Sequence, residues 1–270
     1  MSKKNELKPH YILYIDLLGT KNNLTKDKEN EYIEKIKAIY NETNQRLKLI
    51  YKEVYKNIKI KFKIFSDNVV FAIEKFDKEE ELQKSFKQDI IIELATYFQL
   101  LALEKEILTR GAITIGPFIM DKLMISGSGL VRAYELESKV AIFPRIIIDN
   151  EIAMHFIVSN YISKCINRDN DGIFYINIFQ EMYNNVNSSK IVNSIKNIWS
   201  NCIYNTPFLN FNSVIGKPKV HKTDYNKLQK IYWLITQYNS FCKNNDAAIK
   251  LPIDTQNEFN ILCMEGNYYV

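Results

Sequence analysis

The chain has 270 residues, of which 46% are hydrophobic and 25% charged, and its formal net charge is +5. This is the composition of an ordinary globular protein, long enough for one large domain or two small ones. The sequence contains no apolar run long enough to cross a bilayer, and its polar first ten residues lack the apolar core of a secretory signal. The positive charge is mild and too diffuse to indicate a specific nucleic-acid interface.

Four cysteines, Cys165, Cys202, Cys242 and Cys263, are widely spaced and form no C-x-x-C pair. Such spacing indicates reduced thiols in a cytoplasm rather than a zinc site or a disulfide framework. We therefore expect a cytoplasmic protein.

An apolar run from Tyr11 onward predicts a buried strand over residues 10–17, which ends at Asp16. A carboxylate there is costly to bury without a counter-charge, and a divalent metal is one candidate partner. The plainer interpretation is an aspartate that caps a turn. The following Gly19-Thr20-Lys21 offers a bend, main-chain N–H groups and a cation, all of which suit a phosphate.

Helical spacing of apolar residues predicts long amphipathic helices over residues 26–56 and 78–106. Between them, residues 58–65 alternate Ile or Phe with Lys, and residues 69–74 return as a strand. We expect a β-hairpin with Asp67 at its tip.

Further elements are predicted as a strand at 108–115, a short extended segment at 117–126, a helix at 129–140, a strand at 145–148 and a helix at 150–166. This order predicts an α+β fold with a split βαβ arrangement, a mostly antiparallel sheet and helices on one face.

The last third of the chain is less regular. A strand is predicted at 173–179 and helices at 186–204 and 223–245. We expect residues 169–270 to form a mostly helical extension that packs on a core of residues 1–168.

Asp16 and Asp67 both lie at the end of a β run. Neighbouring strands are about 4.8 Å apart, so the two carboxylates would reach one Mg²⁺ or a pair if the first strand lies beside the hairpin. Taken alone, Asp67 is better explained as a hairpin-turn residue.

Four short fragments follow one another within residues 10–148: Asp16-Leu17-Leu18-Gly19-Thr20, Phe65-Ser66-Asp67, Arg110-Gly111-Ala112-Ile113 and Gly127-x-Gly129-Leu130-x-x-Ala133-x-x-Leu136-Glu137. In this order they resemble the catalytic domain of class III nucleotide cyclases. The resemblance implies a ferredoxin-like, palm βαββαβ core and a head-to-tail homodimer with its sites at the interface.

The same resemblance implies roles for individual residues. Asp16 and Asp67 match the acids that hold two divalent ions, Mg²⁺ or Mn²⁺, with the Leu17 carbonyl as a further ligand. The loop that cradles the triphosphate matches Leu18, Gly19, Thr20 and Lys21. The two base-selecting positions hold Lys63 and Met124.

The transition-state positions depart from the family pattern. They hold Val131 and Glu135, and neither can supply the polar or positive group that a developing phosphate charge needs. Arg110, Arg132 and Arg145 are the candidate replacements, since arginine binds phosphate bidentately. Arg110 or Arg145 is equally explained as a structural partner of Glu135 or Glu137.

The chain is similar to the pyrimidine cyclases of bacterial Pycsar anti-phage systems. The resemblance rests on these departures, on the absence of sensor domains and on the segments Ala133 to Glu137 and Pro144 to Ile146. The expected substrate is then UTP or CTP, and the cyclic UMP or cyclic CMP product would activate a separate effector. Four alternatives stay open: a degenerate cyclase-like nucleotide sensor, an adenylate cyclase on the strength of Lys63, another palm-fold nucleotidyltransferase, and a structural protein.

Overall fold

The computed structural model describes residues 7–20, 24, 27–53, 58–76, 81–157, 162–182, 188–204 and 222–244. The chain divides into two compact units, Met1–Met182 and Tyr183–Val270. None of the helices in these ranges is long and apolar enough to cross a membrane.

A seven-stranded sheet forms the centre of the first unit, with the strand order β2-β3-β1-β4-β7-β9-β8. Every neighbouring pair is antiparallel except β4 and β7, which are parallel. The strands are β1 (Pro9–Leu17), β2 (Ile60–Phe65), β3 (Asn68–Glu74), β4 (Thr109–Pro117), β7 (Ile146–Ile148), β8 (Ile166–Arg168) and β9 (Phe174–Ile176).

Helices connect the first four strands. Helix α2 (Glu29–Glu53) links β1 to β2, and α3 (Glu81–Glu104) links β3 to β4, so the order along the chain is βαββαβ. With the spatial order β2-β3-β1-β4, this is the ferredoxin-like arrangement of two interleaved βαβ units. The predicted α+β class and the mostly antiparallel sheet are confirmed.

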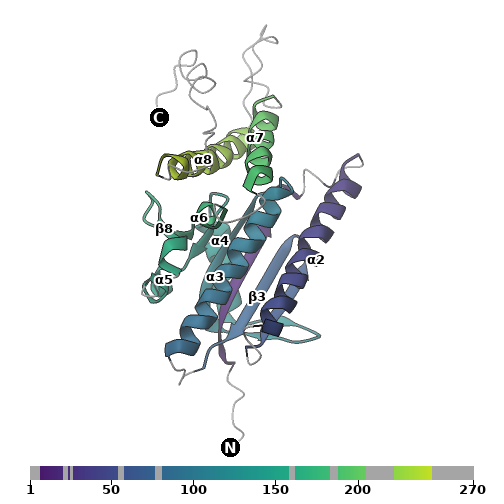
Figure 1. The fold of residues 1–270 in the computed structure, drawn as a ribbon. Coiled ribbons are helices and arrows are strands. Elements are labelled where there is room, and N and C mark those ends of the chain that lie inside the picture. The colour runs from purple at the N-terminus through teal and green to yellow at the C-terminus, as the bar shows by residue number, and fades with distance from the viewer. Residues whose placement is uncertain are drawn as a thin grey trace, which may run out of the picture. The chain divides into compact units, whose positions relative to one another are not determined.

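One face of the sheet packs on α2 and α3, which lie side by side (Figure 1). Leu13 of β1 faces Phe71 of β3 in register, and the Phe71 ring meets Phe98 of α3 edge-on, with 6.3 Å between ring centroids. All three side chains are buried. The apolar stripes of the two long helices therefore form the larger part of the core.

The opposite face carries a second, smaller core. Ile12 and Tyr14, which alternate with Leu13 along β1, cluster with Val70 and with Ala133 of helix α4 (Ser128–Lys139). A small hairpin of β5 (Ile119–Met120) and β6 (Ile125–Ser126) adds Met120 to the same cluster. Helices thus cover both faces, whereas the sequence predicts helices on one face only.

Helix α4 lies unusually close to the sheet because two glycines meet there. A methyl group placed on Gly129 would lie 2.9 Å from the carbonyl carbon of Gly116 in β4 and 2.5 Å from Cδ1 of Ile12. The preceding Gly127 has a φ of 134°, a backbone conformation that side chains rarely tolerate. These contacts bring the polar residues of α4 within reach of the strand ends.

The chain after β7 differs from its predicted elements. The helix expected over 150–166 is α5 (Asn150–Ile157), followed by a 3₁₀ turn, η1 (Ile162–Cys165), and by β8. The strand expected over 173–179 is β9, after which α6 (Ile178–Met182) begins. The β8–β9 hairpin pairs with β7, so residues 169–182 group with the first unit instead of with the predicted extension.

The second unit contains α7 (Ser188–Tyr204) and α8 (Lys222–Asn244), which contact one another. Both helices lie close to their predicted ranges, and the described part of this unit is helical, as expected. The apolar stripe of α8 is buried at Leu228, Ile231, Ile235 and Tyr238. The burial of this stripe indicates that it serves packing.

We expect Gly129→Ala to destabilise the protein, although alanine favours helices by about 1 kcal/mol. The added methyl must displace strand backbone, and such overpacking costs about 1–3 kcal/mol. Thermal unfolding should show a melting temperature several degrees below that of Ser128→Ala, an exposed neighbour in the same helix. Equal melting temperatures would contradict the close contact.

Candidate functional site

The main chains at Asp16 and Asp67 lie next to each other in the fold. β1 and β3 are neighbours, Asp16 lies opposite Asn68 in register, and the Leu17 N–H donates to the Asp67 carbonyl over 3.0 Å. Asp67 is the second residue of the tight β2–β3 turn, in which Ser66 has a φ of 56°. The structure therefore brings together the two acids that the sequence predicts as neighbours.

Neutral hydrogen bonds orient the Asp67 carboxylate. The Tyr14 hydroxyl donates to Oδ1 of Asn68 over 2.7 Å, and Nδ2 of Asn68 donates to Oδ1 of Asp67 over 3.1 Å. Burial of the Tyr14 phenol raises its pKa well above the ordinary value, and the nearby charges of Glu137 and Asp16 raise it further. Tyr14 therefore keeps its proton and acts as a donor at physiological pH.

Arg110 lies between Asp16 and a third carboxylate. It faces Asp16 across β1 and β4, with 3.4 Å between its Nε and Oδ2 of Asp16. The same Nε forms an ion pair with Oε1 of Glu137, whose side chain is only 3% exposed on α4. A buried carboxylate of this kind needs a paired cation, so Arg110 stabilises Glu137 as well as contacting Asp16.

The loop after β1 turns sharply at Gly19, which has a φ of 88°. The Thr20 hydroxyl donates to the Leu17 carbonyl over 3.0 Å and lies 2.7 Å from the hydroxyl of Tyr32. The Leu18 N–H donates to the Leu108 carbonyl over 2.8 Å, so it is already engaged. Lys21, the predicted phosphate-binding cation, lies outside the described residues.

Asp121 of the β5–β6 hairpin contacts both predicted base-selecting residues, Lys63 and Met124. Nζ of Lys63 donates to the Asp121 carbonyl over 3.4 Å, and the Asp121 N–H donates to the Met124 carbonyl over 3.0 Å. Lys63 also faces Val70, which in turn faces Tyr14, so Lys63 lies on the same face of the sheet as Tyr14. Residues more than 50 positions apart in sequence are thus brought to one side of the candidate site.

Arg132 is held by Asp149, the residue after β7. Its guanidinium donates to both carboxylate oxygens, over 2.9 and 3.0 Å, and Thr114 donates to the same carboxylate over 2.9 Å. Burial alone would raise the pKa of Asp149, but these hydrogen bonds outweigh it and lower the pKa. The Arg132 side chain remains 45% exposed, so it is fixed in place yet open to solvent.

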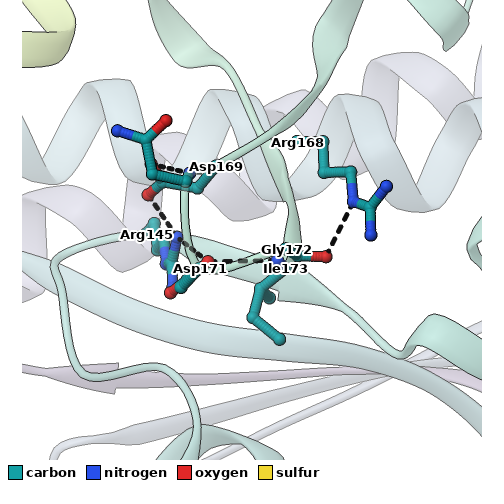
Figure 2. A network of polar contacts seen from close by, with 7 residues as sticks. Arg145, Arg168, Asp169, Asp171, Gly172 and Ile173 are labelled. Carbon is teal, nitrogen blue, oxygen red and sulfur yellow. Dashed lines mark hydrogen bonds and ion pairs between the residues drawn. The ribbon is translucent and has the colours of Figure 1, made fainter.

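Arg145 is buried in a different network (Figure 2). Its guanidinium forms ion pairs with Asp169 and Asp171 of the β8–β9 turn, and its side chain is 1% exposed. The Tyr175 ring lies beside it, 5.7 Å from the guanidinium carbon to the ring centroid. The catalytic role expected of Arg145 stays a prediction, and its contacts favour a structural role.

Val131 and Glu135, at the usual transition-state positions, lie on the solvent side of α4. Val131 is 59% exposed, and Glu135 pairs with Lys139 one turn along the helix, over 2.8 Å. Neither residue contributes a positive group, as the sequence already indicates.

A divalent cation fits the residues at the strand ends. Among the described residues, no three His, Cys, Asp or Glu side chains gather around a metal position. The donor set expected from the sequence is two carboxylates, Asp16 and Asp67, with the carbonyl of Leu17, the residue after Asp16. Mg²⁺ is commonly held by one or two carboxylates together with substrate phosphates, so this set suits a metal that arrives with a nucleotide.

Sequence reasoning did not place Asn68 in the site, and it gave Glu137 only as a possible structural partner. For Tyr14, which orients Asn68, the sequence did offer a signal. It lies two residues before Asp16 and therefore shares its face of β1. The contacts of Asn68 and Glu137 depend on strand register and on the approach of α4.

No family model and no curated protein matches the sequence. Among solved structures, the chain is similar to the crystal structure of the catalytic core of a rhodopsin-guanylyl cyclase with converted specificity in complex with ATPalphaS. The TM-score is 0.40 and the identity 12%, over 65% of this chain and 98% of that chain. A likeness at this level carries no argument about activity.

We expect Arg145→Met to lower the free energy of unfolding by about 3–5 kcal/mol, because it leaves two carboxylates near the sheet without their cation. Urea unfolding measures this loss. The control is Arg168→Gln, which removes an exposed arginine that donates to the Gly172 carbonyl of the same hairpin over 3.1 Å.

Adding Asp169→Asn and Asp171→Asn to Arg145→Met should recover part of the lost stability. A loss no greater than that of Arg168→Gln would contradict the structural role of Arg145.

Proposed function

We propose that the protein is a nucleotide cyclase that converts a nucleoside triphosphate to a 3′,5′-cyclic mononucleotide and pyrophosphate. The observation that carries this proposal is the proximity of Asp16, near the end of β1, and Asp67, in the β2–β3 turn, whose carbonyl accepts the Leu17 main-chain hydrogen bond. The proposal is supported by the position of both acids at the same end of the sheet, where the chain also turns at Gly19.

The proposed roles follow from the chemistry of each group. Asp16, Asp67 and the Leu17 carbonyl would hold one or two Mg²⁺ or Mn²⁺ ions. These ions would favour ionisation of the ribose 3′-hydroxyl and neutralise phosphate charge. The loop of Leu18, Gly19 and Thr20, with Lys21, would position the triphosphate, and most of the rate enhancement would come from positioning and charge.

Arg132 is the better supported candidate for contact with the developing phosphate charge. It comes from α4, it is held rigidly by Asp149, and it keeps half of its side chain in solvent. Arg110 lies nearer the acids but is engaged by Glu137. Arg145 is already bound by two carboxylates, which weakens the case for its direct participation.

We further propose UTP or CTP as the substrate, cytoplasmic anti-phage signalling as the role, and a separate effector as the target of the cyclic product. The sequence resemblance to Pycsar cyclases supports these finer statements. Lys63, which contacts Asp121 of the hairpin that carries Met124, supports the competing adenylate cyclase.

We also propose a homodimer with its sites at the interface, as the sequence resemblance implies. Four large apolar side chains near the candidate site are exposed and suit burial by a second copy: Leu123, Met124, Val131 and Tyr134. The Tyr134 ring lies edge-on to Tyr14, with 6.0 Å between centroids, which connects this exposed face to the core beneath the acids.

A degenerate cyclase-like sensor is the second candidate. It is favoured by the solvent position of Val131, by the Lys139 pairing of Glu135 and by the engagement of Arg145 elsewhere. A sensor would bind a nucleoside triphosphate with metal and release no pyrophosphate.

The deciding experiment incubates the purified protein with ATP, GTP, CTP or UTP and Mn²⁺ or Mg²⁺, and identifies products by mass spectrometry. We expect a cyclic pyrimidine mononucleotide. Asp16→Asn and Asp67→Asn should each lower turnover by about 100-fold or more, since the metal-held charges supply several kcal/mol. The control Glu31→Gln removes an exposed acid on α2.

The outcomes separate the candidates. A cyclic purine product identifies a purine cyclase, and a larger product identifies another nucleotidyltransferase. Thermal stabilisation by a nucleotide without pyrophosphate release identifies the sensor. Full activity in both aspartate variants would contradict the proposed metal site.

The homodimer has its own test. We expect Tyr134→Lys to shift the protein from dimer to monomer in analytical ultracentrifugation, because a charge at a dimer interface is costly to bury. Met154→Lys, which alters an exposed apolar residue on α5, is the control. A monomeric unmodified protein at all concentrations would contradict the dimer.

A further inference from the structure

We propose that Arg110 is a built-in cation that competes with the divalent metal for Asp16, and that Glu137 weakens this competition by retaining Arg110. Glu137 is then a positioning residue that sets metal affinity through Arg110. The inference rests on the proposed function only in taking Asp16 as a metal ligand.

One nitrogen atom is shared between the two carboxylates. Nε of Arg110 lies 3.4 Å from Oδ2 of Asp16 and in closer contact with Oε1 of Glu137. The two acids come from different elements, β1 and α4, and Arg110 reaches them from β4, which lies between β1 and β7 in the sheet. Arg110 therefore has two carboxylate partners and can favour either by a small movement.

Glu137 cannot easily give up its cation. Its side chain is buried, and a buried carboxylate without a counter-charge costs several kcal/mol. The glycine contact between α4 and β4 fixes the helix against the sheet, so Glu137 has no short route to solvent. Arginine stays charged at any physiological pH, so the Glu137 to Arg110 pair persists when another cation binds Asp16.

The Asp67 carboxylate has a neutral hydrogen-bond donor as its neighbour. Asp67 accepts a hydrogen bond from the neutral amide of Asn68, which Tyr14 orients in turn. Such a donor orients a carboxylate without adding a positive charge, and no ion pair to Asp67 forms within the described part of the chain. The competition between a metal and a protein cation therefore acts at Asp16.

The charges give the direction of the effect. A divalent ion at Asp16 repels the Arg110 guanidinium, whereas the Glu137 carboxylate attracts the guanidinium and so keeps it away from the ion. If the Glu137 charge is removed, Asp16 is the carboxylate left to Arg110 among the residues that the structure describes. A metal must then displace Arg110 against both the ion pair and the repulsion between the two cations. Loss of Glu137 should therefore weaken metal binding without any contact between Glu137 and the metal.

The test measures Mn²⁺ binding to the full-length protein by electron paramagnetic resonance, without nucleotide. Glu137→Gln keeps the size of the side chain and should raise the Mn²⁺ dissociation constant by about tenfold, the scale of one altered charge pair near a protein surface. Glu135→Gln is the matched control: it makes the same change on the same helix, where the carboxylate pairs with Lys139 in solvent, and should leave the constant unchanged.

A double variant, Arg110→Met with Glu137→Met, separates competition from damage to the fold. An ion pair replaced by apolar side chains of similar size commonly costs little stability. The competing cation is then absent, so Mn²⁺ should bind at least as tightly as to the unmodified protein. Asp16→Asn should abolish this binding, which assigns the ion to the site.

Two results would overturn the inference. The first is that the unmodified protein and Glu137→Gln bind Mn²⁺ with equal affinity while Asp16→Asn abolishes binding. That result would contradict the role of Glu137 and leave the proposed metal site intact. The second is weak binding by the double variant, which would assign the effect of Glu137 to the fold. Absence of Mn²⁺ binding in every protein tested would count against the metal site of the proposed function itself, and the inference would fall with it.

Discussion

The close approach of helix α4 to the central sheet is the constraint on which the site depends. Gly129 of α4 meets Gly116 of β4 at a distance that no side chain would allow. This contact buries the inner side of α4 against β1 and β4, including Glu137. A carboxylate buried there needs a cation, and β4 supplies Arg110, which also reaches Asp16. Backbone packing thus determines the electrostatics around the first candidate metal ligand.

The sheet presents two faces with different tasks. The face toward α2 and α3 is filled with large apolar side chains such as Phe71 and Phe98, and it supplies most of the core. The other face has a smaller core, around Ile12 and Tyr14, and is bordered by charged residues at the strand ends. The alternation of side chains along the strands therefore separates the larger core from the face that carries the candidate site.

The three arginines predicted as catalytic lie in three different environments. Arg110 is shared between two acids at the site, Arg132 is clamped by Asp149 but open to solvent, and Arg145 is enclosed by Asp169 and Asp171. In the sequence they share only their residue type, which does not distinguish their roles. What separates them is the set of carboxylates that each meets in the folded chain, and these carboxylates lie between 17 and 94 residues away along the sequence.

The sequence by itself determined the βαββαβ element order, the mostly antiparallel sheet and the positions of Asp16 and Asp67 at the ends of β runs. These follow from local periodicity and from turn residues, which act over a few positions. The tertiary structure decided that α4 covers the second face, that residues 169–182 group with the sheet unit, and that Glu137 shares Arg110 with Asp16. Those features depend on contacts between distant segments, chiefly a glycine pair whose closeness no local pattern encodes.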